Sequence, residues 1–330
     1  MTTLVTGATG FVGSAVARAL AARGHGLRLL VRSTSDRRNI AGLDADVVTG
    51  DLTDADSLAR AAAGCRYVLH VAADYRVWVP DPAVMLRANV DGAVAMVRAA
   101  AEAGAERIVH CSSVAALGQI GDGSVADEAT PTNEADFVGV YKRSKYLAEK
   151  AVLELAGRDR LPVVVVNPAA PVGPRDIKPT PTGKMIRDAA AGRMPAYVDT
   201  GLNIVHVDDV ALGHVLALEH GRPGERYVLG GENMLLKDVL ALVADVVNRR
   251  PPSLRLPEAA VWPVALVMEK LANLTGIAPL VTRDHLKMAR KKMFYSSAKA
   301  TAELGYHARP PRLAVQDAVA WFRANGMLAQ

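Results

Sequence analysis

Two residues one helical turn apart have the chemistry of a proton-transfer pair. Tyr141 and Lys145 are four residues apart in a segment, 140–155, whose pattern predicts a helix, so both side chains would project from the same face. A phenol with its ordinary pKa of about 10 is a poor acid or base at neutral pH, but an ammonium group and the positive nicotinamide of an oxidised cofactor would lower that pKa. We therefore expect Tyr141 to exchange a proton with a substrate oxygen while hydride moves between carbon and nicotinamide.

A serine upstream could form a catalytic set with Tyr141 and Lys145. A Tyr-x-x-x-Lys pair alone is frequent by chance and is also typical of an exposed helix. Ser113 follows the predicted strand 107–111, where its hydroxyl could hold a substrate carbonyl and orient the tyrosine. Ser112 is the alternative, because side chains alternate along a strand and only one of the two would point into the site.

A glycine pattern near the N-terminus predicts where a dinucleotide would lie. Three glycines follow the apolar residues Leu4 and Val5 and precede an alanine-rich helix at 14–23. In such a unit the first glycine allows the tight turn, the second lets the backbone approach a pyrophosphate, and the third lets the helix pack on the strand. An ordinary turn is the alternative, but a second apolar strand at 27–31 follows at the spacing of a βαβ unit. The residues expected at the cofactor are Gly7, Thr9, Gly10, Phe11, Val12 and Gly13.

The end of the second strand indicates which dinucleotide would bind. An acidic residue here usually accepts a hydrogen bond from the ribose of NAD, whereas arginine would pair with the 2′-phosphate of NADP. Arg32 occupies this position, with Ser33, Arg37 and Arg38 nearby. A solvated basic loop is the alternative. We expect Arg32 and Arg37 to bind NADP(H), with NAD as the alternative cofactor.

Other segments could add to this site. Asp51, after a short strand at 46–49, could reach the adenine amino group, although helix capping, for which Thr53 and Asp54 are better placed, is a competing role. Small residues after the strand 67–71, Ala72 and Ala73, would let the dinucleotide lie against the backbone.

Asn89 is a polar residue within a long predicted helix at 82–103. An exposed helix face is one explanation for it. A water-bridged contact to Lys145 is the other, and it would make Asn89 part of the catalytic set.

The order of elements predicts the fold class. Strands alternate with helices through the first half, which predicts an α/β, doubly wound parallel sheet of Rossmann type. Prolines cluster between 168 and 181, where we expect the chain to form loops over a substrate. We therefore expect a dinucleotide-binding domain at 1–167, a return of the chain to it at about 203–222 through a strand at 203–207 and a following helix, and a smaller, mainly helical substrate lobe at 168–330.

Composition excludes several classes of partner. The net charge of +5 is mild and only 5% of residues are aromatic, so we expect no nucleic-acid partner. Two cysteines fit a reduced compartment, and no metal-ligand spacing is present. No signal peptide fits and no apolar run reaches the roughly 20 residues of a spanning helix, so we expect a cytoplasmic protein. The helix predicted at 257–275 and the basic run 283–292 favour a solvated lobe surface over a membrane-binding patch.

Together these motifs resemble the extended short-chain dehydrogenase/reductases of the NAD-dependent epimerase/dehydratase superfamily. The motifs run in family order and are Thr6-Gly7-x-x-Gly10-x-x-Gly13, Asp51-Leu52, Asn89-x-x-Gly92, Ser112-Ser113, Tyr141-x-x-x-Lys145 and Asn167-Pro168. The chain is most similar to the dihydroflavonol-4-reductase-like branch and, more narrowly, to the hopanoid-associated sugar epimerases. The narrower resemblance comes from the stretches at 72–76, 176–183 and 194–201.

The resemblance implies roles for individual residues. Ser113 would be the triad serine beside Tyr141 and Lys145, Asn89 would position a lysine-bound water, and the loop after Asn167-Pro168 would meet the nicotinamide. A homodimer through the helices near 83–103 and 141–155 is also implied. The remaining cofactor contacts implied are Asp51, Leu52, Ala72, Ala73, Tyr141, Lys145, Asn167 and Pro168.

Two enzyme activities remain open. The narrow resemblance implies a sugar epimerase, which oxidises and re-reduces one substrate on tightly held NAD, whereas Arg32 fits the exchange of NADPH at every turnover. We expect an NADP(H)-dependent reductase of an aldehyde or ketone on a small-molecule or lipid-linked, sugar-like substrate. An NAD-dependent sugar epimerase or dehydratase, acting in hopanoid biosynthesis, is the alternative. A non-catalytic NADP-binding protein is disfavoured because Tyr141 and Lys145 are both present. The polar or aromatic candidates for the substrate pocket are Tyr75, Arg76, Trp78, Arg175, Lys178, Tyr197 and His206.

Overall fold

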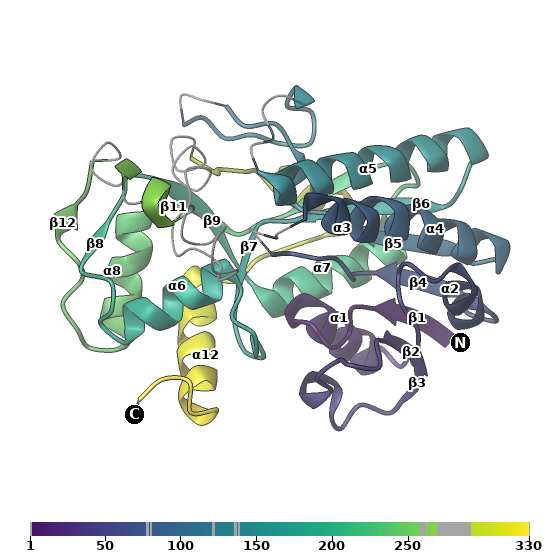
Figure 1. Ribbon diagram of the computed structural model, residues 1–330, viewed down its shortest axis with the longest axis horizontal. Coiled ribbons are helices and arrows are strands. Elements are labelled where there is room, and N and C mark those ends of the chain that lie inside the picture. The colour runs from purple at the N-terminus through teal and green to yellow at the C-terminus, as the bar shows by residue number, and fades with distance from the viewer. Residues whose placement is uncertain are drawn as a thin grey trace.

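A parallel sheet in the order β10-β6-β5-β4-β1-β2-β3 organises the larger lobe (Figure 1). The computed structural model describes residues 2–76, 79, 81–120, 123–134, 137, 139–257, 262–263, 265–268 and 292–329. In this part of the chain every neighbouring pair of the sheet is parallel, as the alternation of strands and helices predicted. The strands are β1 (Thr2–Thr6), β2 (Gly26–Val31), β3 (Ala45–Thr49), β4 (Tyr67–His70), β5 (Arg107–Cys111), β6 (Val163–Pro168) and β10 (Arg226–Leu229).

Helices cover both faces of this sheet, which is why its central strands are apolar on both sides. In β6 the four valines at 163–166 are all fully buried and contribute alternately to two hydrophobic clusters. One face carries α1 (Phe11–Ala22) and α7 (Val207–His220). The other face carries α2 (Ala55–Ala62), α4 (Gly92–Glu102) and α5 (Val140–Asp159). The predicted Rossmann-type fold is confirmed.

The helix predicted over 82–103 contains a change of helical pitch. It begins as α3 (Pro82–Leu86), continues through a π-helical turn, η2 (Arg87–Asp91), and ends as α4. Asn89 lies in the π turn, and such turns often occur at functional sites because they redirect a side chain.

The smaller lobe has its own core (Figure 1). Its helices α6 (Pro181–Ala190), α8 (Leu236–Val246) and α12 (Pro311–Ala324) include the two helices predicted near 235–248 and 311–325. Two small sheets in the described part of the lobe were not predicted. They consist of β7 (Ala170–Val172), β9 (Gly201–His206) and β11 (Glu232–Leu235), and of β8 (Ala196–Tyr197) with β12 (Leu254–Arg255).

The strand predicted at 203–207 is β9, and it does not return to the large sheet. It pairs with β7 and β11, and its residues Leu202 and Ile204 pack on the core of the smaller lobe, while Val205 packs on the core of the large sheet. Helix α7 is the segment that returns, since it packs on α1, and β10 then joins the large sheet beside β6. A further helix, α11 (Ala298–Leu304), contacts α7 and β10.

Three expectations fall on residues outside or largely outside the described part. Trp78 is one of them. The helix predicted at 257–275 and the basic run 283–292 are the others, and only short pieces of them are described. Among the described residues, no helix has both the length and the apolar character needed to cross a membrane.

Because α1 packs closely on the preceding turn, one methyl group added at Gly13 should destabilise the fold. A side-chain carbon at Gly13 would lie 2.1 Å from the Gly7 carbonyl oxygen, so we expect Gly13→Ala to lower the free energy of unfolding by about 1–3 kcal/mol. The measurement is chemical denaturation.

The matched control is Gly157→Ala in α5, where no atom lies within 4 Å of the added carbon. This change should raise the free energy of unfolding by about 0.5–1 kcal/mol, because alanine favours a helix. Equal effects of the two substitutions would contradict the packing argument.

Candidate active site

Ser113, Tyr141 and Lys145 meet at the carboxyl end of β5. The Ser113 hydroxyl is hydrogen-bonded to the Tyr141 hydroxyl and accepts a hydrogen bond from the Ala115 amide at 3.1 Å. The Lys145 ammonium donates to the carbonyl oxygen of Cys111, the last residue of β5, at 2.9 Å. The structure thus places the three predicted residues of the triad beside one another.

Of the two candidate serines, Ser113 is the one that contacts Tyr141. The neighbouring Ser112 hydroxyl is buried and has no hydrogen-bond partner among the described residues. The expectation that only one of the two serines points toward the tyrosine fits this arrangement.

Burial is the largest influence on the pKa of Tyr141 in this structure, and the expected lowering by Lys145 together with an oxidised nicotinamide stays a prediction. Burial raises the pKa of Tyr141 to about 12, and the hydrogen bond with Ser113 opposes this only in part. Burial also lowers the pKa of Lys145, whose ammonium is directed to the Cys111 carbonyl. Desolvation therefore outweighs the ammonium, and a stable phenolate needs a further positive charge, as an oxidised nicotinamide would supply.

Asn89 holds the loop after β4 against the catalytic helix. Its amide nitrogen donates to the Asp74 carbonyl at 2.8 Å and to the Ser144 hydroxyl at 2.9 Å, and its amide oxygen accepts from the Asp74 amide at 2.6 Å. Ser144 in turn donates to the Tyr141 carbonyl at 2.8 Å. Both amide hydrogens of Asn89 are used here, so a water between Asn89 and Lys145 stays a prediction.

The glycine turn has the geometry of a phosphate cradle. Gly7 has a φ of +73°, and a side-chain carbon there would lie 2.7 Å from the Ala72 amide nitrogen. A side-chain carbon at Gly10 would meet only the Gly7 carbonyl, at 3.2 Å, so the backbone at Gly10 can be approached closely.

The N-terminus of α1 follows directly. The amides at the start of a helix lack acceptors within it, and Ser14 is the first here to donate back, to the Gly10 carbonyl at 3.0 Å. The amides of Phe11, Val12 and Gly13 precede it and can serve an anion.

Thr6 joins this cradle to the end of β4. Its hydroxyl accepts from the amides of Val71 at 3.2 Å and Ala72 at 3.1 Å. It also bonds the His70 ring at 2.8 Å. This brings Ala72 and Ala73 beside the glycine turn, where they were expected.

The three arginines after β2 differ in their partners. Arg38 binds Asp36 with two nitrogens, at 2.6 and 3.1 Å, and holds the pKa of that carboxyl at about 2. Arg32 and Arg37 are exposed and form no ion pair with any residue that the structure describes. They are the two arginines available to a phosphate.

The side chain of Asp51 does not cap the next helix. It accepts from the Thr53 amide at 2.9 Å and hydroxyl at 2.7 Å, which lowers its pKa, with a smaller contribution from Arg32. Asp54 caps α2 by accepting from the Ser57 amide at 3.1 Å. The competing role in capping therefore belongs to Asp54, and adenine binding by Asp51 stays a prediction.

The remaining predicted cofactor residues line the base of the site. Asn167 donates to the Ser113 carbonyl at 3.1 Å and to Glu149 at 2.6 Å, and Pro168 ends the buried strand β6. Leu52 packs on Gly92 of α4, so its side chain belongs to the core and only its backbone could face a cofactor.

Several candidates for the substrate pocket are engaged within the protein. Arg76 pairs with Asp74, and Arg175 pairs with Asp208. His206 is buried and bonds Asp317 at 3.0 Å. These contacts explain the three polar residues without a substrate.

Tyr75, Lys178 and Tyr197 remain candidates for the pocket. Tyr75 is exposed and its hydroxyl lies 3.5 Å from the Lys178 carbonyl, while Tyr197 lies half-buried in β8 of the smaller lobe.

Asn39 was missed by the sequence analysis. It is buried, and its amide nitrogen donates to the Thr9 carbonyl at 3.2 Å and to the Arg175 carbonyl at 3.0 Å. Its only sequence signal is a polar residue after a run of charged ones, which is equally typical of an exposed loop.

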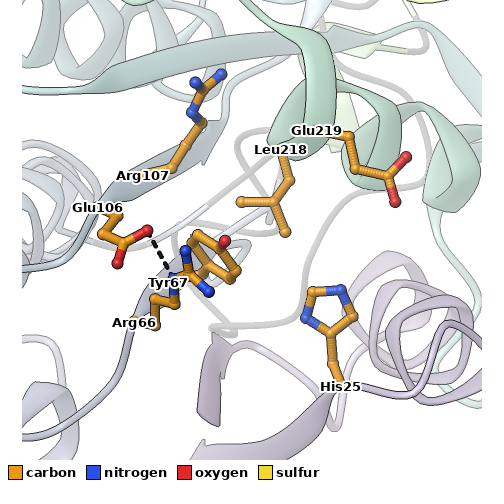
Figure 2. Close-up of a pocket in the computed structure, with 7 residues that line it drawn as sticks. All are labelled: His25, Arg66, Tyr67, Glu106, Arg107, Leu218 and Glu219. Carbon is orange, nitrogen blue, oxygen red and sulfur yellow. Dashed lines mark hydrogen bonds and ion pairs between the residues drawn. The ribbon is translucent and has the colours of Figure 1, made fainter. Parts of the chain in front are cut away.

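A separate pocket of about 330 Å³ lies at the amino-terminal edge of the sheet (Figure 2). Across it, Arg66 donates to Glu106 at 2.6 Å. Ligands of doubly wound sheets bind at the carboxyl ends of the strands, so this pocket is not part of the candidate active site. The pocket is lined by His25, Arg66, Tyr67, Glu106, Arg107, Leu218 and Glu219.

Within the described ranges, no group of three His, Cys, Asp or Glu residues could hold a metal ion.

Comparison with known proteins agrees with this geometry. The model of the NAD dependent epimerase/dehydratase family matches residues 3–230. A Synechocystis protein with the provisional name dihydroflavonol 4-reductase is 42% identical over 98% of this chain and 94% of its own. Sterol demethylase protein B of Methylococcus capsulatus is 34% identical over 99% of this chain and all of its own. The crystal structure of gox2253 is 60% identical, covers 99% of both chains and superposes with a TM-score of 0.90.

These matches confirm the resemblance that the motifs indicated, including its dihydroflavonol-4-reductase-like character. They also show that the chain is an enzyme of the oxidoreductase type. The chain belongs to the NAD dependent epimerase/dehydratase family of extended short-chain dehydrogenase/reductases.

Proposed function

We propose that this protein is an NADP(H)-dependent reductase that converts an aldehyde or ketone of a small-molecule or lipid-linked, sugar-like substrate into an alcohol. The observation that carries the proposal is the pair of exposed arginines, Arg32 and Arg37, at the end of β2, where an NAD-selective site would have a carboxylate. A 2′-phosphate can form charge-assisted hydrogen bonds with both guanidinium groups.

Different residues of the chain would bind the cofactor and transfer the proton. The amides at the start of α1 would hold the pyrophosphate, and Arg32 and Arg37 the 2′-phosphate. NADPH, when bound, supplies the hydride that adds to the carbonyl carbon. Ser113 would hold the carbonyl oxygen, and Tyr141 would give that oxygen its proton, so that the alcohol forms and NADP⁺ leaves. Lys145 is the neighbouring residue from which Tyr141 could recover a proton.

The pKa of Tyr141 is compatible with a proton donor and does not by itself choose between the two activities. A proton donor must begin the reaction protonated, and a pKa of about 12 keeps the phenol protonated at neutral pH. An epimerase begins by removing a proton from a substrate alcohol, and there the positive nicotinamide of NAD would favour the phenolate, so the choice between the activities rests on the cofactor.

The alternative is an NAD-dependent sugar epimerase or dehydratase. The name of the matching family supports it, while the name of the Synechocystis relative supports a carbonyl reductase. The Methylococcus relative is named for a sterol, which supports a bulky apolar or lipid-linked substrate and is compatible with a role in hopanoid biosynthesis. Binding to a membrane surface and homodimer formation stay predictions.

Cofactor preference tests the role of the arginines. Arg32→Ala and Arg37→Ala should each raise the dissociation constant for NADPH about tenfold to a hundredfold, since each removes a charge-assisted contact, and should leave NADH binding nearly unchanged. The measurement is titration of nicotinamide fluorescence.

Arg38→Ala is the matched control, because it removes the same charge from an arginine that Asp36 already occupies. It should change NADPH binding less than about threefold, the effect of a screened surface charge. Preference of the wild-type protein for NADH, or equal effects of all three changes, would contradict the proposal.

Removal of the tyrosine hydroxyl tests the proton transfer. Tyr141→Phe should reduce turnover about 10²- to 10⁴-fold, the usual contribution of a general acid, while NADPH still binds. The assay follows loss of NADPH absorbance across a panel of aldehydes and ketones. Tyr146→Phe is the control, because this tyrosine lies on the same helix but its ring stacks on that of Phe137, with 4.3 Å between the ring centroids. An unimpaired Tyr141→Phe enzyme would refute the assigned role.

A further inference from the structure

We infer that Asn39 is a positioning residue that ties the glycine turn to a loop of the smaller lobe and thereby sets how fast the dinucleotide leaves. The loop, residues 173–178, is called the strap below. The inference rests on the proposed dinucleotide site but not on the choice between NADP and NAD.

One amide group joins the two parts. Asn39 is 4% exposed, and its two amide hydrogens go to the Thr9 carbonyl at 3.2 Å and to the Arg175 carbonyl at 3.0 Å, with the Gly10 carbonyl at 3.5 Å. Thr9 and Gly10 belong to the phosphate cradle, whereas Arg175 belongs to the strap. A single side chain therefore makes contact with both sides of the predicted pyrophosphate site.

The contact on the cradle side fixes a peptide in the middle of the glycine turn. A peptide unit is planar, so holding the Thr9 carbonyl also fixes the direction of the Gly10 amide, which donates the opposite way to the Gly7 carbonyl at 2.9 Å. Without Asn39 this peptide would lose the side-chain hydrogen bond to its carbonyl oxygen.

The contact on the strap side depends on an unusual backbone conformation. Arg175 has a φ of +76°, in the left-handed region that residues other than glycine rarely adopt. Its carbonyl accepts from Asn39 and from the Ile177 amide at 2.9 Å, and its guanidinium pairs with Asp208 at the start of α7. Such a conformation persists only where surrounding contacts stabilise it, and here contacts to the backbone carbonyl and to the side chain of Arg175 do so.

The strap also touches the far side of the site. The Tyr75 hydroxyl, after β4, lies 3.5 Å from the Lys178 carbonyl. The strap thus passes from Asn39, beside the arginines after β2, to the loop that follows β4. A dinucleotide lying along the carboxyl ends of these strands would lie beneath it.

A reductase must release its oxidised cofactor at every turnover, whereas an epimerase keeps it. In the first case the Asn39 link opens and closes once in each cycle, and its strength limits the rate of release. Changes of this kind act mainly on dissociation rates.

Stopped-flow measurement of NADPH displacement tests the inference. Asn39→Asp keeps the size of the side chain but replaces its two donors with acceptors and adds a negative charge near the expected phosphates, so the neutral Asn39→Leu, which removes the donors without adding charge, is measured beside it and should show the same acceleration. We expect NADPH to dissociate about tenfold faster, because two hydrogen bonds are lost. NADH is measured in parallel, so that the result does not depend on cofactor preference.

Asn203→Asp is the matched control. Asn203 is equally buried, and its amide nitrogen donates to Asn233 at 2.8 Å and to the Tyr295 carbonyl at 3.1 Å in the smaller lobe. It should reduce stability as Asn39→Asp does but leave dissociation unchanged. An unchanged rate in folded Asn39→Asp, or the same acceleration in both variants, would overturn the inference.

Hydrogen exchange of the wild-type protein gives a test that needs no variant. Bound cofactor should slow amide exchange in residues 173–180 as well as in the glycine turn. Protection of the glycine turn alone would overturn the role of the strap. Failure of the wild-type protein to bind either NADPH or NADH would instead overturn the proposed function, and this inference with it.

Discussion

The contact between Gly13 and the Gly7 carbonyl is the constraint on which the site depends. With no side chain between them, α1 packs directly on the turn after β1, and a single carbon at Gly13 would lie 2.1 Å from that oxygen. The packing directs the first amides of α1 toward the carboxyl edge of the sheet, where parallel strands bring their following loops together. The arginines after β2, the small residues after β4 and Ser113 after β5 all lie at this edge because the sheet is parallel.

Desolvation acts on the proton-transfer residues at the same edge. Tyr141 and Lys145 are both removed from water, and burial favours the neutral form of each. A neutral phenol beside Ser113 is ready to donate a proton, while the ammonium is held by the strand carbonyl of Cys111 rather than by the phenol. The same three residues would act as a base only with additional positive charge nearby, so the charge state of the nicotinamide couples cofactor to proton transfer.

Local patterns predicted much of this arrangement. The glycine spacing gave the position of α1, and the four-residue spacing of Tyr141 and Lys145 placed them on one face of α5, because both patterns depend only on neighbouring residues. The partners of side chains distant in sequence could not be predicted. Asn39 links two loops and β9 pairs in the smaller sheet, since each of these depends on tertiary contacts. Burial, which raises the pKa of Tyr141, also depends on tertiary packing and was not predicted, while the lowering of that pKa beside an oxidised nicotinamide stays a prediction.

The central claim is that this enzyme exchanges NADP(H) instead of retaining NAD. Mass spectrometry of the dinucleotide that stays bound after gel filtration of the purified protein tests it most directly. The account predicts NADP⁺ or NADPH in less than one equivalent per chain, because an exchanging cofactor dissociates on the column. One equivalent of NAD per chain, retained through the same column, would contradict it.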